Sequence, residues 1–343
     1  MHVIESQGVS EAFYLGLQLL KENGIRRDSR AGEVIEYPEP VCTVYRAPEQ
    51  RVLFYEERNA NPFFHFFEAF WMLAGRQDVS YVTNFNKRMS EFSDDGVIFH
   101  GAYGYRWRNY FGYDQLDRIV NRLGHIQGDR RAVLSMWDAR MDLKKYDEDN
   151  CKDLPCNTHI YFKVRPCDYR YENKKIQNPA QLDMTVCCRS NDIIWGTYGT
   201  NVVHFSMLQE YLAARLNAQL GVYRHISDSF HAYSSVFDKV KNIQPDFKPY
   251  EAWDYKVKPL VDDPESFKNE LLRFLENPCT KMSGARNSIF PNVAYPMIIA
   301  WEACKNVKDI NYALTTVSNI EAIDWRIACT EWLERRKGRL DDK

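Results

Sequence analysis

The stretches DLPCNTHIYFKVR (residues 153–165) and LDMTVCCRSND (residues 182–192) decide the fold. Both contain runs of apolar, β-branched and aromatic residues of strand length, and we expect them to be strands of one sheet. The proline in the first stretch predicts a turn into its strand, which would present Cys156 at a sheet edge. The second strand ends in Arg189 and Asp192, so a nucleophile, an anion-binding group and a carboxylate fall within one short region.

The rest of the chain predicts helices around this sheet. Helical spacing of apolar residues or helix end signals occur at 8–22, 61–75, 113–126 and 200–221. Further strands are expected at 41–46, 51–56, 131–137 and 222–233. Two segments are expected to be turns: the polar residues 26–40, and GAYGYRWR (101–108), which would present Tyr103. This order of elements predicts an α+β fold with a mixed β-sheet and flanking helices.

The chain of 343 residues has no Gly/Ser-rich linker and no internal repeat. We therefore expect a single domain, 1–343. Residues 262–343 are expected to be mainly helical and to cover the sheet as part of the same domain. The alternative for that segment is an interaction module.

Charge and composition exclude several classes of protein. The net charge of −2 supplies no basic field for nucleic acid or a membrane surface, so any anion must be held by a local arginine cluster. The N-terminus is too charged for a signal peptide, and no run of about 18 apolar residues predicts a membrane span. Nine cysteines show no metal-ligand spacing, and neither do five of the histidines. We expect a reduced cytoplasmic protein without a metal, in which the following histidines are structural or on the surface: His100, His125, His159, His204 and His225.

Cys156 is a candidate nucleophile. At pH 7 a thiol of ordinary pKa is only a few per cent ionised, but that fraction reacts strongly and nearby arginines would increase it. Taken alone, this residue fits a core cysteine better. Four arginines, if the fold brings them together, would form one phosphate site, although each alone fits a surface charge. They are Arg30, Arg130, Arg131 and Arg189.

Glu68 lies in the apolar segment FFHFFEAFWML, where a carboxylate needs partners because burying it unpaired is costly. A proton-transfer role and a structural role are equally favoured. His231 and Tyr233 are two residues apart, so on a strand they share a face. They would hold a sugar hydroxyl or, as the simpler alternative, face solvent.

Several motifs together resemble the thymidylate synthase family, in that family's order, across residues 28–235. They are SRAG (29–32), Glu68 to Trp71 on a helix, YGYRWR (103–108), YDQL (113–116), DRRAVLSMW (129–137), LPCN (154–157), RSND (189–192), Asn201 before a long helix and HAY (231–233). The resemblance implies a thymidylate synthase-like fold and a homodimer packed sheet to sheet, with each active site borrowing two arginines from its partner.

The resemblance also implies a role for each matching residue. The nucleophile would be Cys156, with Glu68 and Tyr103 organising water and protons. The nucleotide would be held by Arg30, Arg189 and Ser190 at the phosphate, Arg130 and Arg131 from the partner, His231 and Tyr233 at the sugar, and Asn201 at the base. The folate would be contacted by Asp192, Trp71 and Gly196.

The implied chemistry is a one-carbon transfer to a pyrimidine. A thiolate that adds to carbon 6 makes carbon 5 nucleophilic, which is covalent catalysis. Carbon 5 then takes a one-carbon unit from 5,10-methylenetetrahydrofolate, and loss of the folate leaves an exocyclic methylene. Hydride would convert this methylene to a methyl group, and water would convert it to a hydroxymethyl group.

Departures from the family pattern favour the hydroxymethyl product. Asn157 stands where thymidylate synthases have histidine, and Gly199-Thr200 stand where they have proline and phenylalanine. The charged end EWLERRKGRLDDK differs from the apolar tail that shields hydride transfer, so water should reach the methylene. RSND and the Asn-Thr pair after Cys156 are similar to viral deoxycytidylate hydroxymethylases. A viral origin would place the protein in the host cytoplasm.

The base stays open between cytosine and uracil. Asn201 would pair with uracil as in thymidylate synthases, whereas a flipped amide would pair with cytosine. The likeness to deoxycytidylate enzymes favours dCMP narrowly over dUMP. The rival functions are a thymidylate synthase that makes dTMP and releases dihydrofolate, and a silent nucleotide- or RNA-binding protein, against which an intact Cys156 and Glu68 argue.

Overall fold

The computed structural model describes residues 1–146, 151–165, 169–171, 174–176, 180–245, 247, 250 and 256–341. Within these ranges, an eight-stranded mixed sheet forms the centre of the fold, with the main strand order β1-β4-β10-β9-β6-β5. The strands are β1 His2–Ser6, β2 Ile25–Ser29, β3 Gly32–Tyr37, β4 Val41–Tyr45, β5 Val133–Ser135, β6 Asn157–Arg165, β9 Gln181–Asp192 and β10 Gln219–Tyr233. A separate pair is formed by β7 Tyr169–Tyr171 and β8 Lys174–Ile176.

The two stretches that decide the fold are neighbours in this sheet, as predicted. Strand β6 is antiparallel to β9, and Asn157 lies opposite Cys188. Strand β9 is parallel to β10, and Asp192 lies opposite His231. The start of β6 and the ends of β9 and β10 therefore meet at one end of the sheet, which brings Cys156 near the polar ends of two other strands.

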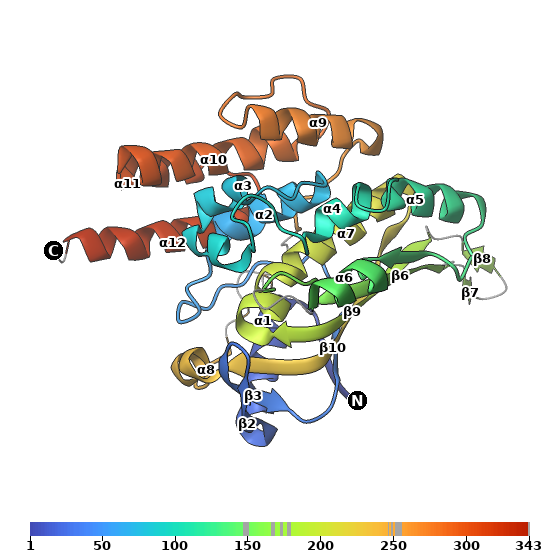
Figure 1. Ribbon diagram of the computed structural model, residues 1–343. Helices are drawn as coiled ribbons and strands as arrows, with labels where there is room; N and C mark the ends of the chain where they lie inside the picture. The colour runs from blue at the N-terminus through green and yellow to red at the C-terminus, as the bar shows by residue number, and fades with distance from the viewer. Residues whose placement is uncertain are drawn as a thin grey trace.

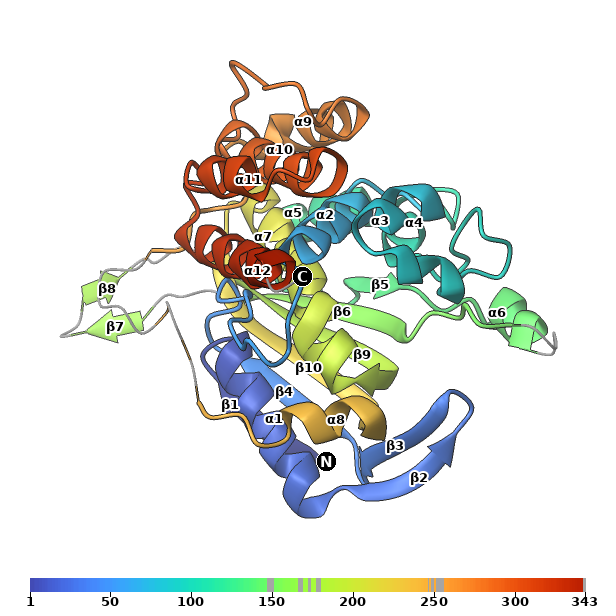
Figure 2. The same ribbon diagram turned by 90° about the vertical axis from the view of Figure 1, so that its left-hand side faces the viewer.

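Helix α2 (Pro62–Leu73) is the buried centre of the helical layer. Asn61 accepts a hydrogen bond from Phe64 N, and Pro62 occupies the first turn, where its missing N–H costs nothing. All residues of the helix are buried, and it packs against α7 (Asn201–Arg215). Figures 1 and 2 show α2 and α7 between the sheet and an outer group of helices, α9–α11.

The remaining helices complete the layers on the sheet. Helix α1 buries Val9, Phe13 and Leu17, as its predicted apolar face requires. The bounds are α1 Val9–Asn23, α3 Val79–Phe85, α4 Tyr103–Arg108, α5 Gln115–His125, α6 Ala139–Tyr146, α8 Ser234–Val240, α9 Pro264–Glu276, α10 Tyr295–Glu302, α11 Ile310–Val317 and α12 Ile323–Asp341. Short 3₁₀ or π segments are η1 Lys87–Phe92, η2 Ile193–Thr200, η3 Phe290–Ala294 and η4 Ala303–Val307.

Two expected segments of regular structure are wrong. Residues 51–56 form no strand: Arg51 N donates to the Glu49 carbonyl, and Val52 N donates to Tyr250 Oη instead of to a neighbouring strand. The helix expected to reach residue 221 ends at Arg215, and Asn217 adopts a left-handed conformation (φ 49°) before β10 begins.

Two expected turns are also wrong. Residues 26–40 contain the hairpin of β2 and β3, and only Arg30 and Ala31 remain as its turn. Residues 103–108 form helix α4, so Tyr103 begins a helix. Local polarity obscured the hairpin, and its pairing with the long strand β10 through β3 supplies the partner that the sequence did not show.

Among the described residues, no helix has the length and apolar character needed to cross a bilayer. The same residues contain no group of three or more His, Cys, Asp or Glu side chains placed to bind a metal ion. The sheet-to-sheet homodimer involves a second chain and stays a prediction.

Candidate active site

A cavity of about 250 Å³ brings together five of the predicted site residues. They come from α2, α4, the entry to β6 and the start of α7, which are far apart in the sequence. They are Cys156, Glu68, Trp71, Tyr103 and Asn201. Convergence of a thiol, a carboxylate, a phenol and an amide on one cavity is the arrangement that covalent catalysis on a polar ring needs.

Cys156 occupies the turn into β6, and Arg189 on β9 holds that turn. The Cys156 carbonyl accepts a hydrogen bond from Arg189 N at 2.9 Å. The guanidinium of Arg189 donates to the carbonyls of Pro155 and Leu154, each at 3.1 Å. Burial raises the pKa of the Cys156 thiol, and the positive charge of Arg189 opposes that rise. Arg189 therefore both positions the sulfur and favours its thiolate.

Tyr103, at the start of α4, stands beside the thiol. Its hydroxyl oxygen accepts a hydrogen bond from Asn157 N at 3.3 Å. Burial raises the pKa of Tyr103 well above its usual value, and the neighbouring thiols of Cys156 and Cys188 add to the effect. The phenol is therefore protonated at neutral pH and is available as a hydrogen-bond donor in the cavity.

Glu68 on α2 is only 5% exposed, and its Oε2 lies 3.0 Å from His204 Nε2. His204 lines the cavity as well, although the sequence placed it among structural or surface histidines. The available signal was its position three residues after Asn201, because residues three apart share a helix face. The two atoms lie within ion-pair distance, but neither has a well-aligned hydrogen-bond partner among the described residues.

Asn201 is oriented by a chain of buried polar groups. Its Nδ2 donates to Asn191 Oδ1 at 3.0 Å, and Asn191 Nδ2 contacts His225 Nε2 at 2.6 Å and donates to Ser227 Oγ at 3.1 Å. Burial lowers the pKa of His225 to about 3, so the ring is neutral and Nε2 accepts. Its Nδ1 lies 2.7 Å from Tyr223 Oη. This series of polar groups leaves Asn201 Oδ1 without a hydrogen-bond donor among the described residues.

Two residues predicted to contact folate, Asp192 and Gly196, contact other residues of this protein in the structure. Asp192 caps η2 by accepting hydrogen bonds from Ile194 N at 2.8 Å and Trp195 N at 2.6 Å. Gly196 lies against the asparagine pair: a Cβ there would approach Asn191 Oδ1 to 2.9 Å and Asn201 Nδ2 to 3.3 Å. Neither residue lines the cavity, and their contact with folate stays a prediction.

The predicted phosphate and sugar residues are split between two regions. Burial raises the pKa values of both Cys156 and Tyr233, and the charge of Arg30, in the β2–β3 turn, opposes part of each rise, which places Arg30 on the thiol side of the site. His231 is buried at the end of β10, with its Nδ1 3.1 Å from Ser229 Oγ. Ser190 lies opposite Ser229 in the β9–β10 register.

Arg130 and Arg131 lie away from this cavity. Both are exposed in the loop between α5 and β5, and Arg131 forms an ion pair with Asp129 at 3.0 Å. Their predicted place in a partner's site stays a prediction.

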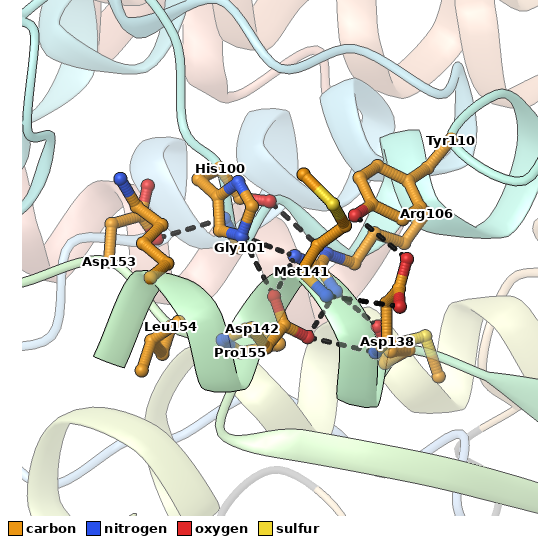
Figure 3. Close-up of polar contacts among 12 residues, drawn as sticks. His100, Gly101, Arg106, Tyr110, Asp138, Met141, Asp142, Asp153, Leu154 and Pro155 are labelled. Atoms are coloured by element: carbon orange, nitrogen blue, oxygen red, sulfur yellow. Dashed lines mark hydrogen bonds and ion pairs between the residues drawn. The ribbon is translucent and has the colours of Figure 1, made fainter. Parts of the chain in front are cut away.

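A buried ion-pair cluster supports α4 and the cavity rim (Figure 3). Arg106 donates two hydrogen bonds to the Asp142 carboxylate, at 2.7 and 2.8 Å, and both side chains are fully buried. His100 Nε2 lies 2.8 Å from the same carboxylate. Burial raises the pKa of Asp142, but hydrogen bonds from His100 and Arg106 outweigh it and hold the pKa well below the usual value. This cluster joins α4 to α6.

Comparison with known proteins shows the family of the chain. The sequence profile described as "Thymidylate synthase" matches residues 22–271. A protein of Pseudomonas phage M6 named deoxyuridylate hydroxymethyltransferase is 45% identical over 357 aligned positions, which cover 99% of this chain and 96% of that protein. Proteins with the same name from Bacillus phage SP01 and Delftia phage PhiW-14 are 37% and 29% identical, over 59% and 71% of this chain and 51% and 65% of their own lengths.

Proposed function

The chain belongs to the thymidylate synthase family, and from this premise we propose that it hydroxymethylates carbon 5 of a pyrimidine 2′-deoxynucleoside monophosphate. The observation that carries the proposal is the shared cavity of Cys156, Glu68, Tyr103 and Asn201. The names of three phage relatives, each called a deoxyuridylate hydroxymethyltransferase, support hydroxymethyl as the product.

The reaction begins with addition of Cys156 Sγ to carbon 6 of the ring. Arg189 favours the thiolate, and the protonated hydroxyl of Tyr103 is placed to donate a hydrogen bond near the reacting carbons. Glu68, with His204 3.0 Å from its Oε2, would take the proton that leaves carbon 5. The nucleophile and the acid–base groups thus occupy different walls of one cavity.

The cavity also suits a flat, partly apolar co-substrate. Trp71, Met89, Phe92 and Phe99 line it, and aromatic faces stack well on a planar heterocycle. When bound there, 5,10-methylenetetrahydrofolate supplies the one-carbon unit. We propose that Trp71 packs against the folate, and that Asp192 and Gly196, at and within the η2 segment, also contact it.

We propose that the base is uracil. Asn201 Oδ1 is a free acceptor while Nδ2 is already partly engaged by Asn191, and uracil presents a ring N–H at position 3 where cytosine presents a bare nitrogen. The three relatives are named for deoxyuridylate. The narrow preference for dCMP drawn from the sequence is the alternative, and the assay below compares both.

The phosphate and sugar sites complete the proposal. Arg30, Arg189 and Ser190 would hold the phosphate, with Arg130 and Arg131 supplied by a second copy of the chain, and His231 and Tyr233 would hold the 3′-hydroxyl. A mixing experiment tests the shared site. Inactive Cys156→Ser protein and inactive Arg131→Ala protein should regain activity when their subunits are exchanged, because one mixed site keeps both groups. Absence of any recovered activity after proven exchange would contradict the sharing.

The direct test is the product. The protein is incubated with 5,10-methylenetetrahydrofolate and either dUMP or dCMP, and the nucleotide and folate are identified by mass spectrometry. We expect 5-hydroxymethyl-dUMP and tetrahydrofolate, with slower turnover of dCMP. A 5-methyl product with dihydrofolate would show a thymidylate synthase instead, and faster turnover of dCMP would reverse the base assignment.

A further inference from the structure

Asp153 is a carboxyl group in the cavity to which the sequence assigned no role. It lines the cavity together with Cys156, which follows it by three residues, and with Glu68 from the opposite helix. Its Oδ1 accepts a hydrogen bond from Gly101 N at 3.0 Å, as Figure 3 shows. Its Oδ2 is buried and has no hydrogen-bond partner among the described residues. A buried carboxylate oxygen is costly to leave unpaired, so its position beside the nucleophile calls for a ligand or a water.

The carboxyl is held in place by the backbone. A Cβ at position 101 would come within 2.6 Å of Asp153 Oδ1, so glycine lets the backbone approach this closely. The adjoining His100 belongs to the buried cluster with Arg106 and Asp142, which fixes the segment before α4. One oxygen therefore serves as the anchor, and the other has no partner among the described residues.

The surrounding charges adjust the proton affinity of the group. Burial raises the pKa of Asp153 to about 6, the charge of Asp94 adds to the rise, and the backbone N–H groups of Gly101 and His100 oppose it. Asp94 itself is paired with Lys145 at 2.8 Å. A carboxyl whose pKa lies near neutrality can both take and release a proton at working pH, as general base catalysis needs.

The same charge disfavours the thiolate. Asp153 raises the pKa of the Cys156 thiol, against the effect of Arg189. Thiolate formation is therefore not the step that Asp153 favours. The proposed function assigns loss of the carbon 5 proton to Glu68 and His204, so the other step that needs a base is the addition of water.

We propose that Asp153 is the general base for water addition to the exocyclic methylene carbon, an inference that rests on the proposed function. The Asp153 carboxylate takes one proton from water while the water oxygen bonds to the methylene carbon. The electron pair of the exocyclic double bond moves onto the ring carbonyl as an enolate. When that pair returns, the double bond between carbons 5 and 6 forms and the carbon–sulfur bond breaks, releasing Cys156 as thiolate. The proton on Asp153 then passes to the thiolate or to solvent.

The test separates water addition from the earlier steps. Asp153→Asn keeps an oxygen for Gly101 N–H but removes the base. With dUMP tritiated at carbon 5, tritium release reports the steps up to the methylene, and hydroxymethyl product reports water addition. With enzyme in excess, so that each site turns over once, we expect tritium release close to that of the wild type and hydroxymethyl formation slowed about 100-fold or more. Added 2-mercaptoethanol, a nucleophile that needs less base assistance, should divert product to the 5-thioether.

Two further measurements exclude a merely structural role. The wild-type rate of hydroxymethyl formation should fall below an apparent pKa of about 6, and this limb should be absent in Asp153→Asn. Asp94→Asn removes a neighbouring negative charge, so the acid limb of its pH–rate profile should move to lower pH while the maximal rate stays unchanged. This variant also tests the proposal if Asp153→Asn does not fold.

The proposal is overturned if Asp153→Asn loses tritium release and hydroxymethyl product in parallel, with no diversion to the thioether. It is also overturned if Asp153→Asn forms product at the wild-type rate, or if the acid limb of the pH–rate profile does not move in Asp94→Asn. If the wild type makes no hydroxymethyl product at all, the proposed function fails instead.

Discussion

Replacing Asp142 by Asn should destabilise the protein strongly, because it leaves the Arg106 guanidinium buried without a counter-charge. Both side chains have no exposed surface, and two hydrogen bonds at 2.7 and 2.8 Å join them. Removing one partner of such a pair costs about 3–5 kcal/mol. With about 2.1 cal/mol/K of unfolding entropy per residue, the 343-residue chain loses about 4–7 °C of melting temperature. Tyr103 stands on the same short helix as Arg106, so turnover should fall as well.

The assay is thermal unfolding by calorimetry, with Asp117→Asn as the matched control. Asp117 pairs with Arg215 at 3.0 Å but is 39% exposed, and its loss should cost less than about 1 kcal/mol. The pKa of Asp142 is lowered in the folded state, so its stabilising effect is fully present above the usual value of 3.8 and is lost as the pH falls below it. The difference in melting temperature between the wild type and Asp142→Asn should therefore become smaller as the pH falls into the acid range. Two results would contradict this prediction. One is a loss of melting temperature in Asp142→Asn no larger than that in Asp117→Asn, and the other is a loss that stays constant through the acid range.

Other predictions concern the cavity. Cys156→Ser should abolish turnover but keep nucleotide affinity in titration calorimetry, because a serine hydroxyl is not ionised at neutral pH; turnover near the wild-type rate would contradict this. Arg189→Met should raise the pKa of the Cys156 thiol further and move its alkylation by iodoacetamide to higher pH, whereas an unchanged profile would show that the charge has no effect. Gly196→Ala should raise the KM for the nucleotide, since its Cβ would crowd Asn191 Oδ1 at 2.9 Å, and an unchanged KM would count against that contact. Asn191→Ala should lower the preference for dUMP over dCMP about 2- to 12-fold, the value of one hydrogen bond of about 0.5–1.5 kcal/mol, and an unaltered ratio would show that Asn201 is oriented by other groups.

The central strands and the buried helix were predictable because their signals are local. Apolar runs ending in polar residues define β6 and β9, and Asn61 followed by Pro62 marks the start of α2. Residues 51–56 have the same apolar character, but Val52 N donates to the side chain of the distant Tyr250, which no local pattern reveals. For residues 51–56, contacts with segments far away in the sequence determine that a loop forms and not a strand.

The candidate site divides in the same way. Cys156 and Arg189 were found from their motifs, and the structure ties one to the other through the backbone of residues 154–156. His204 and Asp153 were missed, because their roles depend on packing of α7 against α2 and on the close approach of Gly101. Those contacts join segments far apart in the chain. The proposed contribution of Arg130 and Arg131 to a second subunit's site involves another chain, so it depends on the mixing experiment with Arg131→Ala.

The central claim is that Cys156 bonds covalently to the pyrimidine, and trapping that bond tests it most directly. With 5-fluoro-dUMP and 5,10-methylenetetrahydrofolate, fluorine at carbon 5 cannot leave as a proton does, so the reaction should stop while the sulfur is still attached. Mass spectrometry of the intact protein should show a complex of protein, nucleotide and folate, with the modification on the peptide that contains Cys156. Absence of an adduct, or an adduct on Cys151 or Cys187 instead, would contradict the account.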